Sequence, residues 1–219
     1  MGESGNYSQG EAQRSLGERW NGKHWRVQLT PSHKNPAGGT HLQSVSCRTA
    51  HWCLAVGYIG YTPPRGSIAV PIAEMWTGHG RQWSFSRLPV PTNAERTFLN
   101  GVSCASKTSC TAVGYAYIGV RDTPVAEHWD GHKWTVQSVP TVDETNAYFN
   151  AISCPTAKRC VAVGAAPSAV FNSSLPLVEE WDGSTWSSDT TPTIAGPGLQ
   201  IEDVLAGVSC LTPTACTAD

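Results

Sequence analysis

Hydrophobic and polar positions repeat along this chain in short, regularly spaced phrases. One phrase has the form Leu-x-x-Val-Ser-Cys, then five residues, then Cys-x-Ala-Val-Gly, and it is clearest over residues 99–114. Related copies begin at Leu42, Phe149 and Leu205, and the last copy reaches Asp219 without its final Val-Gly. Short runs rich in valine and alanine, bounded by serine and glycine, are typical of β-strands. Each copy therefore predicts two short strands joined by a five-residue connection.

A second phrase, Glu-x-Trp-(Asp/Asn)-Gly-x-x-Trp, alternates with the first. It begins at Glu18, Glu127 and Glu179, and a copy at Glu74 has two extra residues between its glycine and its second tryptophan. Asn-Gly and Asp-Gly between apolar flanks favour a tight hairpin turn, because glycine adopts the positive φ that such turns need. Two tryptophans that face each other across the turn would stabilise the hairpin. This phrase predicts the third and fourth strands of each repeat.

The spacing of the first phrase predicts the architecture. Successive copies start 57, 50 and 56 residues apart, and the final 15 residues together with the first 41 have the length of one more repeat. Four-stranded repeats of this length favour a β-propeller. We therefore expect one all-β domain over residues 1–219, with four blades of four antiparallel strands, closed by N-terminal and C-terminal strands that share one blade. The alternative is a piece of a longer array. The predicted blades are 42–98, 99–148, 149–204, and 205–219 joined with 1–41.

Eight cysteines occur as four Cys-x5-Cys pairs, one in each copy of the first phrase. The repeat favours four local disulfides, Cys47–Cys53, Cys104–Cys110, Cys154–Cys160 and Cys210–Cys216. Structural zinc is the alternative, although its ligands are usually spaced more closely. Disulfides indicate a secreted or cell-surface protein. The first twenty residues lack the apolar core of a signal peptide, so we expect the leader to lie outside this sequence.

Composition excludes several classes of function. Charged residues make up 15% of the chain and the net charge is -2, which gives no electrostatic basis for binding nucleic acid. No apolar run approaches the ~18 residues of a membrane span. Phosphate-binding loops, dinucleotide fingerprints and nucleophile elbows are absent from the sequence. We predict no cofactor and no metal site.

The two phrases together resemble known repeat families. The Gly-x-x-Trp hairpins are distantly similar to Asp-box and kelch-like propeller repeats. The combination of Ser-Cys-x5-Cys-x-Ala-Val-Gly with Glu-x-Trp-Asp/Asn-Gly-x-x-Trp resembles secreted β-propeller-like repeat proteins of actinobacteria, over residues 16–219. The resemblance implies a propeller fold and does not specify an activity.

Long connections are predicted at one end of the repeats and short ones at the other. The long ones join strands two and three (58–72, 115–125 and 165–177) and strand four to the next repeat (30–41, 89–98, 140–148 and 191–204). Binding residues usually lie in such loops on a rigid scaffold. Aromatic, arginine and carboxylate side chains in these loops form the candidate binding set: Tyr61, Arg65, Tyr117, Arg121, Asp122, Asp143, Glu144 and Tyr148.

Residues that recur in every repeat favour structural roles. We interpret the glutamates that precede the first tryptophans (Glu18, Glu74, Glu127 and Glu179) as structural rather than as a catalytic ring. The serines that precede the first cysteines (Ser46, Ser103, Ser153 and Ser209) are expected to form hydrogen bonds along the inner strands. The seven histidines show no metal-binding spacing.

Three functional hypotheses remain. The first is a secreted, lectin-like binding module that recognises a glycan, a cell-wall polymer or a protein through the long-loop rim. The second is a glycoside hydrolase or lyase that uses the blade-specific carboxylates Asp122, Asp143 and Glu144. The third is a structural spacer or an assembly part.

Overall fold

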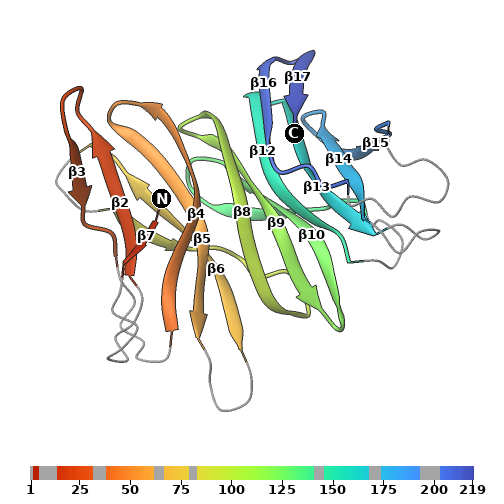
Figure 1. Cartoon of the computed structure of the whole chain (residues 1–219), viewed down its shortest axis with the longest axis horizontal. Helices are drawn as coiled ribbons and strands as arrows, with labels where there is room; N and C mark the ends of the chain where they lie inside the picture. The colour runs from red at the N-terminus through yellow and green to blue at the C-terminus, as the bar shows by residue number, and fades with distance from the viewer. Residues whose placement is uncertain are drawn as a thin grey trace.

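The computed structural model describes residues 2–4, 14–31, 38–61, 67–78, 83–140, 146–167, 174–192 and 203–219. Within these ranges the chain forms β-strands and connections, and no helix is present. The protein is therefore all-β, as predicted. Its strands form successive antiparallel units that stand in a row (Figure 1).

Three complete units each contain four strands in an antiparallel meander, and we call them the first, second and third blades. The first blade contains β4 (Gly38–Thr49), β5 (Trp52–Tyr61), β6 (Ile68–Trp76) and β7 (Ser84–Arg87). The second contains β8 (Ala94–Ser106), β9 (Ser109–Ile118), β10 (Arg121–Trp129) and β11 (Trp134–Gln137). The third contains β12 (Tyr148–Thr156), β13 (Arg159–Pro167), β14 (Ser174–Trp181) and β15 (Trp186–Asp189). Four strands per complete repeat agrees with the prediction, and the arrangement is propeller-like.

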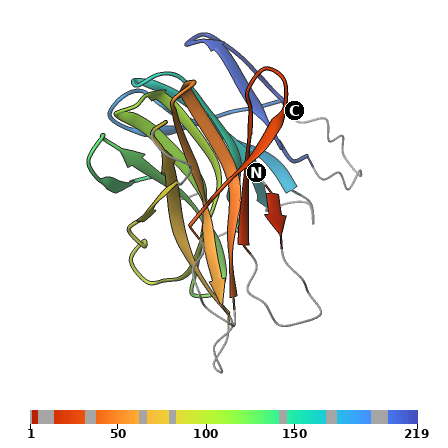
Figure 2. The same ribbon diagram turned by 90° about the vertical axis from the view of Figure 1, so that its left-hand side faces the viewer.

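The two ends of the chain form separate half-blades. The N-terminal half-blade contains β1 (Gly2–Ser4), β2 (Arg14–Trp20) and β3 (Trp25–Gln28), and it lies beside the first blade. The C-terminal half-blade is the hairpin of β16 (Val208–Thr212) and β17 (Ala215–Ala218), beside the third blade. Figure 2 shows the row from its N-terminal side, with the red β2–β3 hairpin toward the viewer.

The predicted closure of the ring is not observed. Among the described strands, none of the N-terminal half-blade pairs with one of the C-terminal half-blade, and the two belong to different sheets. Figure 1 shows the β2–β3 hairpin at the left end of the row and the β16–β17 hairpin above β12 and β13. The prediction rested on length alone, and length does not determine how far each blade turns relative to the next.

Most of the buried apolar residues lie between blades. One cluster joins the first and second blades through Leu54, Val56, Leu99 and Val102. Another joins the second and third blades and includes the fully buried Phe149. The second strand of each blade is buried on both faces, which explains the nearly continuous apolar run that follows each second cysteine. Each complete blade is therefore stabilised chiefly by its neighbours.

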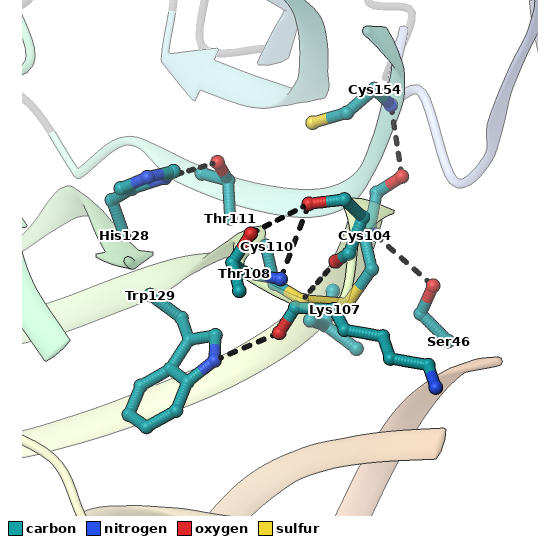
Figure 3. Close-up of a disulfide and its surroundings, with 12 residues drawn as sticks. Ser46, Cys104, Lys107, Thr108, Cys110, Thr111, His128, Trp129 and Cys154 are labelled. Atoms are coloured by element: carbon teal, nitrogen blue, oxygen red, sulfur yellow. Dashed lines mark hydrogen bonds between the residues drawn. A yellow bond between two sulfur atoms is a disulfide. The ribbon is translucent and has the colours of Figure 1, made fainter. Parts of the chain in front are cut away.

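Three of the four serines that precede the first cysteines form hydrogen bonds on the inner strands, as predicted. These bonds link neighbouring blades. The backbone N–H of Cys104 donates to Ser46 Oγ at 3.1 Å (Figure 3), and that of Cys154 donates to Ser103 Oγ at 2.9 Å. The N–H of Cys210 donates to Ser153 Oγ at 3.0 Å. A row of hydrogen bonds therefore runs along the innermost strands from the first blade to the C-terminal half-blade.

The four predicted disulfides are present, and no described cysteine is free. Each disulfide joins the first and second strands of its repeat beside a two-residue turn, and Figure 3 shows the Cys104–Cys110 bond. The alternative of a zinc site is excluded, because every cysteine sulfur is bonded to another sulfur. The predicted five-residue connection is largely strand, since β8 and β9 continue to Ser106 and from Ser109.

The tryptophan hairpins also match their prediction. The rings of Trp129 and Trp134 lie 5.7 Å apart on directly opposed residues, and Trp181 and Trp186 repeat this arrangement. In the turn, Asp130 Oδ1 accepts the backbone N–H groups of residues 132 and 133 at 2.8 and 2.9 Å. The glycine that follows has φ 98°, which explains its recurrence.

The glycine at the end of Cys-x-Ala-Val-Gly is required by close backbone contact. A Cβ on Gly114 would lie only 1.9 Å from the carbonyl oxygen of Phe98, and Gly57 and Gly164 have the same environment. The first strand shifts register here, between Leu99 and Gly101, and this brings its backbone against the glycine. The glycine is therefore a packing requirement of the inner hairpin.

Gly114→Ala is expected to lower the free energy of unfolding by about 3 kcal/mol, because the backbone of β8 must move to admit the methyl group. Gly60→Ala is a matched control, since a Cβ there meets nothing closer than 3.5 Å. Chemical denaturation of both variants measures the difference. Equal stability of the two would contradict the close contact.

Candidate functional site

The connections predicted as long loops are partly strand. Residues 115–125 were expected to form a loop, but β9 continues to Ile118 and β10 begins at Arg121. Only Gly119 and Val120 form the turn, and Gly119 has φ 66°. The alternation of tyrosine, alanine and isoleucine after Gly114 favours a strand. Tyr117 and Asp122 are therefore cross-strand partners on a rigid hairpin.

The structure describes most but not all of the predicted binding set. Asp122 and Tyr148 are half-buried and line one pocket. Tyr117 is also half-buried, and its ring lies under the Arg96 guanidinium at 4.3 Å. Arg121 is exposed at the start of β10. Tyr61 ends β5, and its side chain lies outside the description, as do residues Arg65, Asp143 and Glu144.

A row of aromatic rings crosses the three blades beside the pocket. Successive ring centroids are separated by 4.7, 4.8, 5.0 and 6.1 Å along the row His41, Tyr58, Phe98, Tyr115 and Tyr148. Each ring comes from the start of a first strand or the end of a second strand. All five are half-buried, so part of each side chain is accessible from solvent.

The pocket lies where the innermost strands of the four repeats converge. It is open and about 570 Å³ in volume. Its lining residues are Gln43, Asn100, Tyr115, Asp122, Tyr148, Asn150 and Ala206. Each of the four repeats contributes one lining residue from the same position, directly after the first apolar residue of the phrase (Gln43, Asn100, Asn150 and Ala206).

Two pocket asparagines bridge neighbouring repeats. Asn100 Nδ2 donates to the carbonyl of Phe149 at 2.8 Å, and Asn150 Nδ2 donates to the carbonyl of Leu205 at 2.9 Å. Their positions are therefore set by the stacking of the blades. Each amide oxygen keeps its capacity to accept a hydrogen bond, since the bridge uses the NH₂ group.

Asp122 is held in place by the connection that leads into the third blade. Its backbone N–H donates to Asn146 Oδ1 at 3.0 Å, and its carbonyl accepts the N–H of Ala147 at 3.1 Å. Burial raises the pKa of the Asp122 carboxyl, and the Arg96 guanidinium partly offsets this effect. Burial, followed by the charge of Asp122, raises the pKa of the Tyr115 hydroxyl. The pocket thus combines one carboxyl group, two phenols and several amides.

Sequence reasoning missed the amides, and from the aromatic row it selected the tyrosines (Tyr58, Tyr115 and Tyr148) but not His41 and Phe98. Gln43, Asn100 and Asn150 recur at one position inside an otherwise apolar phrase, and this polar exception was an available signal. Likewise, an aromatic ring precedes the phrase in three repeats and a tyrosine follows its glycine in two. Neither recurrence was used as a signal, because repeated residues were interpreted as structural and binding residues were sought in the long connections.

The recurring glutamates do not line this pocket. Glu74, Glu127 and Glu179 are fully buried on third strands. Burial raises the pKa of Glu127 to about 8, and it does the same for Glu74, where the Ser15 hydroxyl partly offsets it. Burial also raises the pKa of Glu179, whose Oε1 accepts a hydrogen bond from Ser188. Glu18 differs from the other three because it is exposed.

No cluster of three or more metal-ligating side chains occurs among the residues that the structure describes. In the same part of the chain, no helix has the length and apolar character needed to cross a bilayer.

Comparisons with known proteins find only distant structural neighbours. No protein-family profile matches the chain, and no curated protein matches it significantly. Among solved structures, "YCF48 bound to D1 peptide" matches with a TM-score of 0.44 and 13% identity, over 72% of this chain and 43% of that chain. A structure described as "Glycoside hydrolase" matches with a TM-score of 0.46 and 7% identity, over 83% of this chain and 63% of that one. This chain therefore spans less than two thirds of either neighbour, and both are only distantly similar to it.

Proposed function

We propose that this protein is a secreted, propeller-like binding module that recognises a glycan through the pocket between its innermost strands. The single β-propeller domain over residues 1–219 is part of this proposal. The observation that supports it is the aromatic row that ends in the pocket at Tyr115 and Tyr148, beside Asp122 and the repeated amides.

The chemistry of the pocket suits a saccharide. The C–H faces of a sugar ring pack well on accessible aromatic rings, and its hydroxyls need both donors and acceptors. Asp122 accepts, whereas Asn100, Asn150 and Gln43 supply amide oxygens and N–H groups. A few fixed polar groups beside aromatic walls are typical of small-ligand sites. A cell-wall polymer is the natural source of such a saccharide for a secreted protein, and a protein ligand is the alternative.

Four disulfides support a location outside the cytosol, because thiols remain reduced inside most cells.

Catalysis is the second candidate, and one observation favours it. Asp122 is a pocket carboxyl whose pKa is raised by burial, as a general acid requires. Glycoside hydrolysis normally needs a second carboxyl about 5–9.5 Å away. Asp143 and Glu144 are the sequence candidates for that role, and the remaining described pocket residues contain no carboxylate.

The binding proposal is tested with a glycan array, followed by calorimetry on the best saccharide. Tyr148→Ala is expected to weaken binding at least tenfold, because it removes a stacking face, whereas Tyr148→Phe should bind within threefold of the parent. Asp122→Asn is expected to weaken binding at least fivefold. Asp189→Asn is its control, since Asp189 is exposed on β15 away from the pocket.

Three results would count against binding at this site. If no saccharide or cell-wall preparation binds the folded protein, a structural spacer or a protein ligand replaces the proposal. If a polysaccharide panel shows turnover that Asp122→Asn abolishes and Asp189→Asn retains, the protein is an enzyme. Unchanged binding in Tyr148→Ala would place the site elsewhere.

A further inference from the structure

The N-terminal half-blade is the outer half of a blade. Trp25 lies opposite Trp20, as Trp134 lies opposite Trp129 in the second blade. Gln28 Oε1 accepts the indole N–H of Trp83 in the first blade at 3.1 Å. In the same way, Gln137 accepts the indole N–H of Trp186 in the third blade at 3.1 Å. The half-blade therefore packs on the first blade as the second packs on the third.

The C-terminal half-blade is the inner half of a blade. Its Cys210 continues the row of serine hydrogen bonds from the third blade. In the complete blades the second strand is buried and pairs with a third strand, as β13 pairs with β14. In contrast, every residue of β17 is exposed. Within the described residues β17 pairs with β16 alone, so it presents an unpaired edge.

The registers of the two half-blades are complementary. In each complete blade the second cysteine lies opposite the first tryptophan, as for Cys160 and Trp181. This register would place Cys216 opposite Trp20 and Ala218 opposite Glu18. In the third blade, Gly164 pairs with Leu177, and Leu16 is the counterpart of Leu177 on β2. Leu16 already pairs with Gly2 of β1. Residues 17–20 pair with β3 along one edge, and among the described strands their other edge is available to β17.

Side chains that are buried in complete blades are exposed on the N-terminal half-blade. Trp25 is 65% exposed, compared with 8% for Trp134 and 5% for Trp186. Glu18 is exposed, whereas Glu74, Glu127 and Glu179 are 0% exposed. Trp134 and Trp186 are buried in clusters that include residues of the preceding blade, and no described blade covers that face of the N-terminal half-blade. An exposed apolar surface of this kind favours association.

We propose that two copies of this chain associate head to tail, with β17 of each copy pairing with residues 17–20 of the other. Each junction then completes one blade, in the register shared by the three complete blades. A second copy fits better than the same chain, because the N-terminal half-blade lies beside the first blade and the C-terminal half-blade beside the third, with no pairing between them (Figure 1). Pairing between copies completes both half-blades and leaves every described contact between blades unchanged. This association does not depend on whether the pocket binds a saccharide.

Site-specific crosslinking tests the pairing between copies. Chains that carry Glu18→Cys and one tag are mixed with chains that carry Ala218→Cys and another tag, in a glutathione redox buffer. A covalent dimer with both tags is expected on a non-reducing gel, because these positions match the opposed pair Glu179 and Ala162. Val120→Cys in place of Ala218→Cys should give no such dimer, because Val120 is exposed on the turn between β9 and β10 of the second blade.

The same mixture separates the alternatives. If the mixed chains give no dimer, and a chain with both cysteines forms only an internal crosslink, then closure within one chain is correct and the proposal is wrong. If neither forms, the half-blades do not pair at all, which also overturns the proposal.

Native mass measurement supplies an independent readout. The parent protein is expected at twice the mass of one chain, and Glu18→Lys should raise the dissociation constant at least tenfold by burying a cation opposite Ala218. Glu18→Gln keeps the shape without the charge and should remain dimeric. Glu18 is exposed in the single chain, so each variant should keep the parent's circular dichroism. A parent protein that is monomeric at 50 µM would overturn the proposal.

Discussion

Glu127→Gln is expected to raise the melting temperature at pH 8 and to change it little at pH 4.5. Both carboxylate oxygens of Glu127 are buried without a hydrogen-bond partner. Burial raises its pKa to about 8, so the folded protein holds a proton that the unfolded chain releases at a lower pH. The stability associated with this group is fully present below about pH 4.5, and it is lost as the pH rises toward 8. The loss is at most on the order of 5 kcal/mol.

Thermal melts across this pH range check the prediction. The parent should be more stable at pH 5 than at pH 8, and Glu127→Gln should have a flatter profile. Glu180→Gln is the matched control, because Glu180 is partly exposed and lies 2.7 Å from the Arg159 guanidinium. A stabilised Glu180→Gln variant, or a less stable Glu127→Gln variant at pH 8, would refute this explanation. Glu74→Gln should behave as Glu127→Gln, since its pKa is raised to the same value.

Reduction of the four disulfides is expected to lower the melting temperature by about 20 °C. Each closes a loop with its cysteines six residues apart, worth about 2 kcal/mol in the chain-entropy description. Four such terms, roughly 8 kcal/mol, are comparable with the total stability of a typical domain. Melts with and without a phosphine reductant, with mass spectrometry of the thiols, provide the measurement.

Single disulfides can be compared because all four close loops of equal length. Replacing Cys104 and Cys110 by alanine should cost more than replacing Cys210 and Cys216. The first pair is 2% and 1% exposed and fills the core between blades, whereas Cys216 is exposed. Equal losses would mean that loop entropy acts alone, and an unchanged melting temperature on full reduction would contradict the role of the disulfides.

The repeats carried enough local information to predict the strands. The cysteine spacing predicted the disulfides, and the Asp-Gly turns predicted the tryptophan hairpins, because both depend on residues close in sequence. The serines of the first phrase were also correctly assigned to hydrogen bonds, since a residue repeated in each blade serves the contact between blades. Residues 115–125 were misassigned as a loop because Gly119 was not identified as the glycine of a tight turn.

The candidate site was predicted only in part. Asp122 and Tyr148 were selected from the sequence, and the structure brings them together although they belong to different blades. Asn100 and Asn150 were missed, because a residue that recurs in several repeats was taken to be structural. They do bridge the blades, and they also line the pocket. A repeated residue can therefore serve both purposes when its strand faces the centre of the row.

The sequence alone determined the all-β class, the four strands of each complete repeat, the disulfide pairing and the hairpin turns. Each of these follows from contacts within about ten to thirty residues. Only the tertiary structure decided that the two half-blades lie apart, that aromatic rings from three blades form one row, and which residues meet in the pocket. These features depend on how each blade packs and turns against the next, and that angle arises from the whole buried surface between blades.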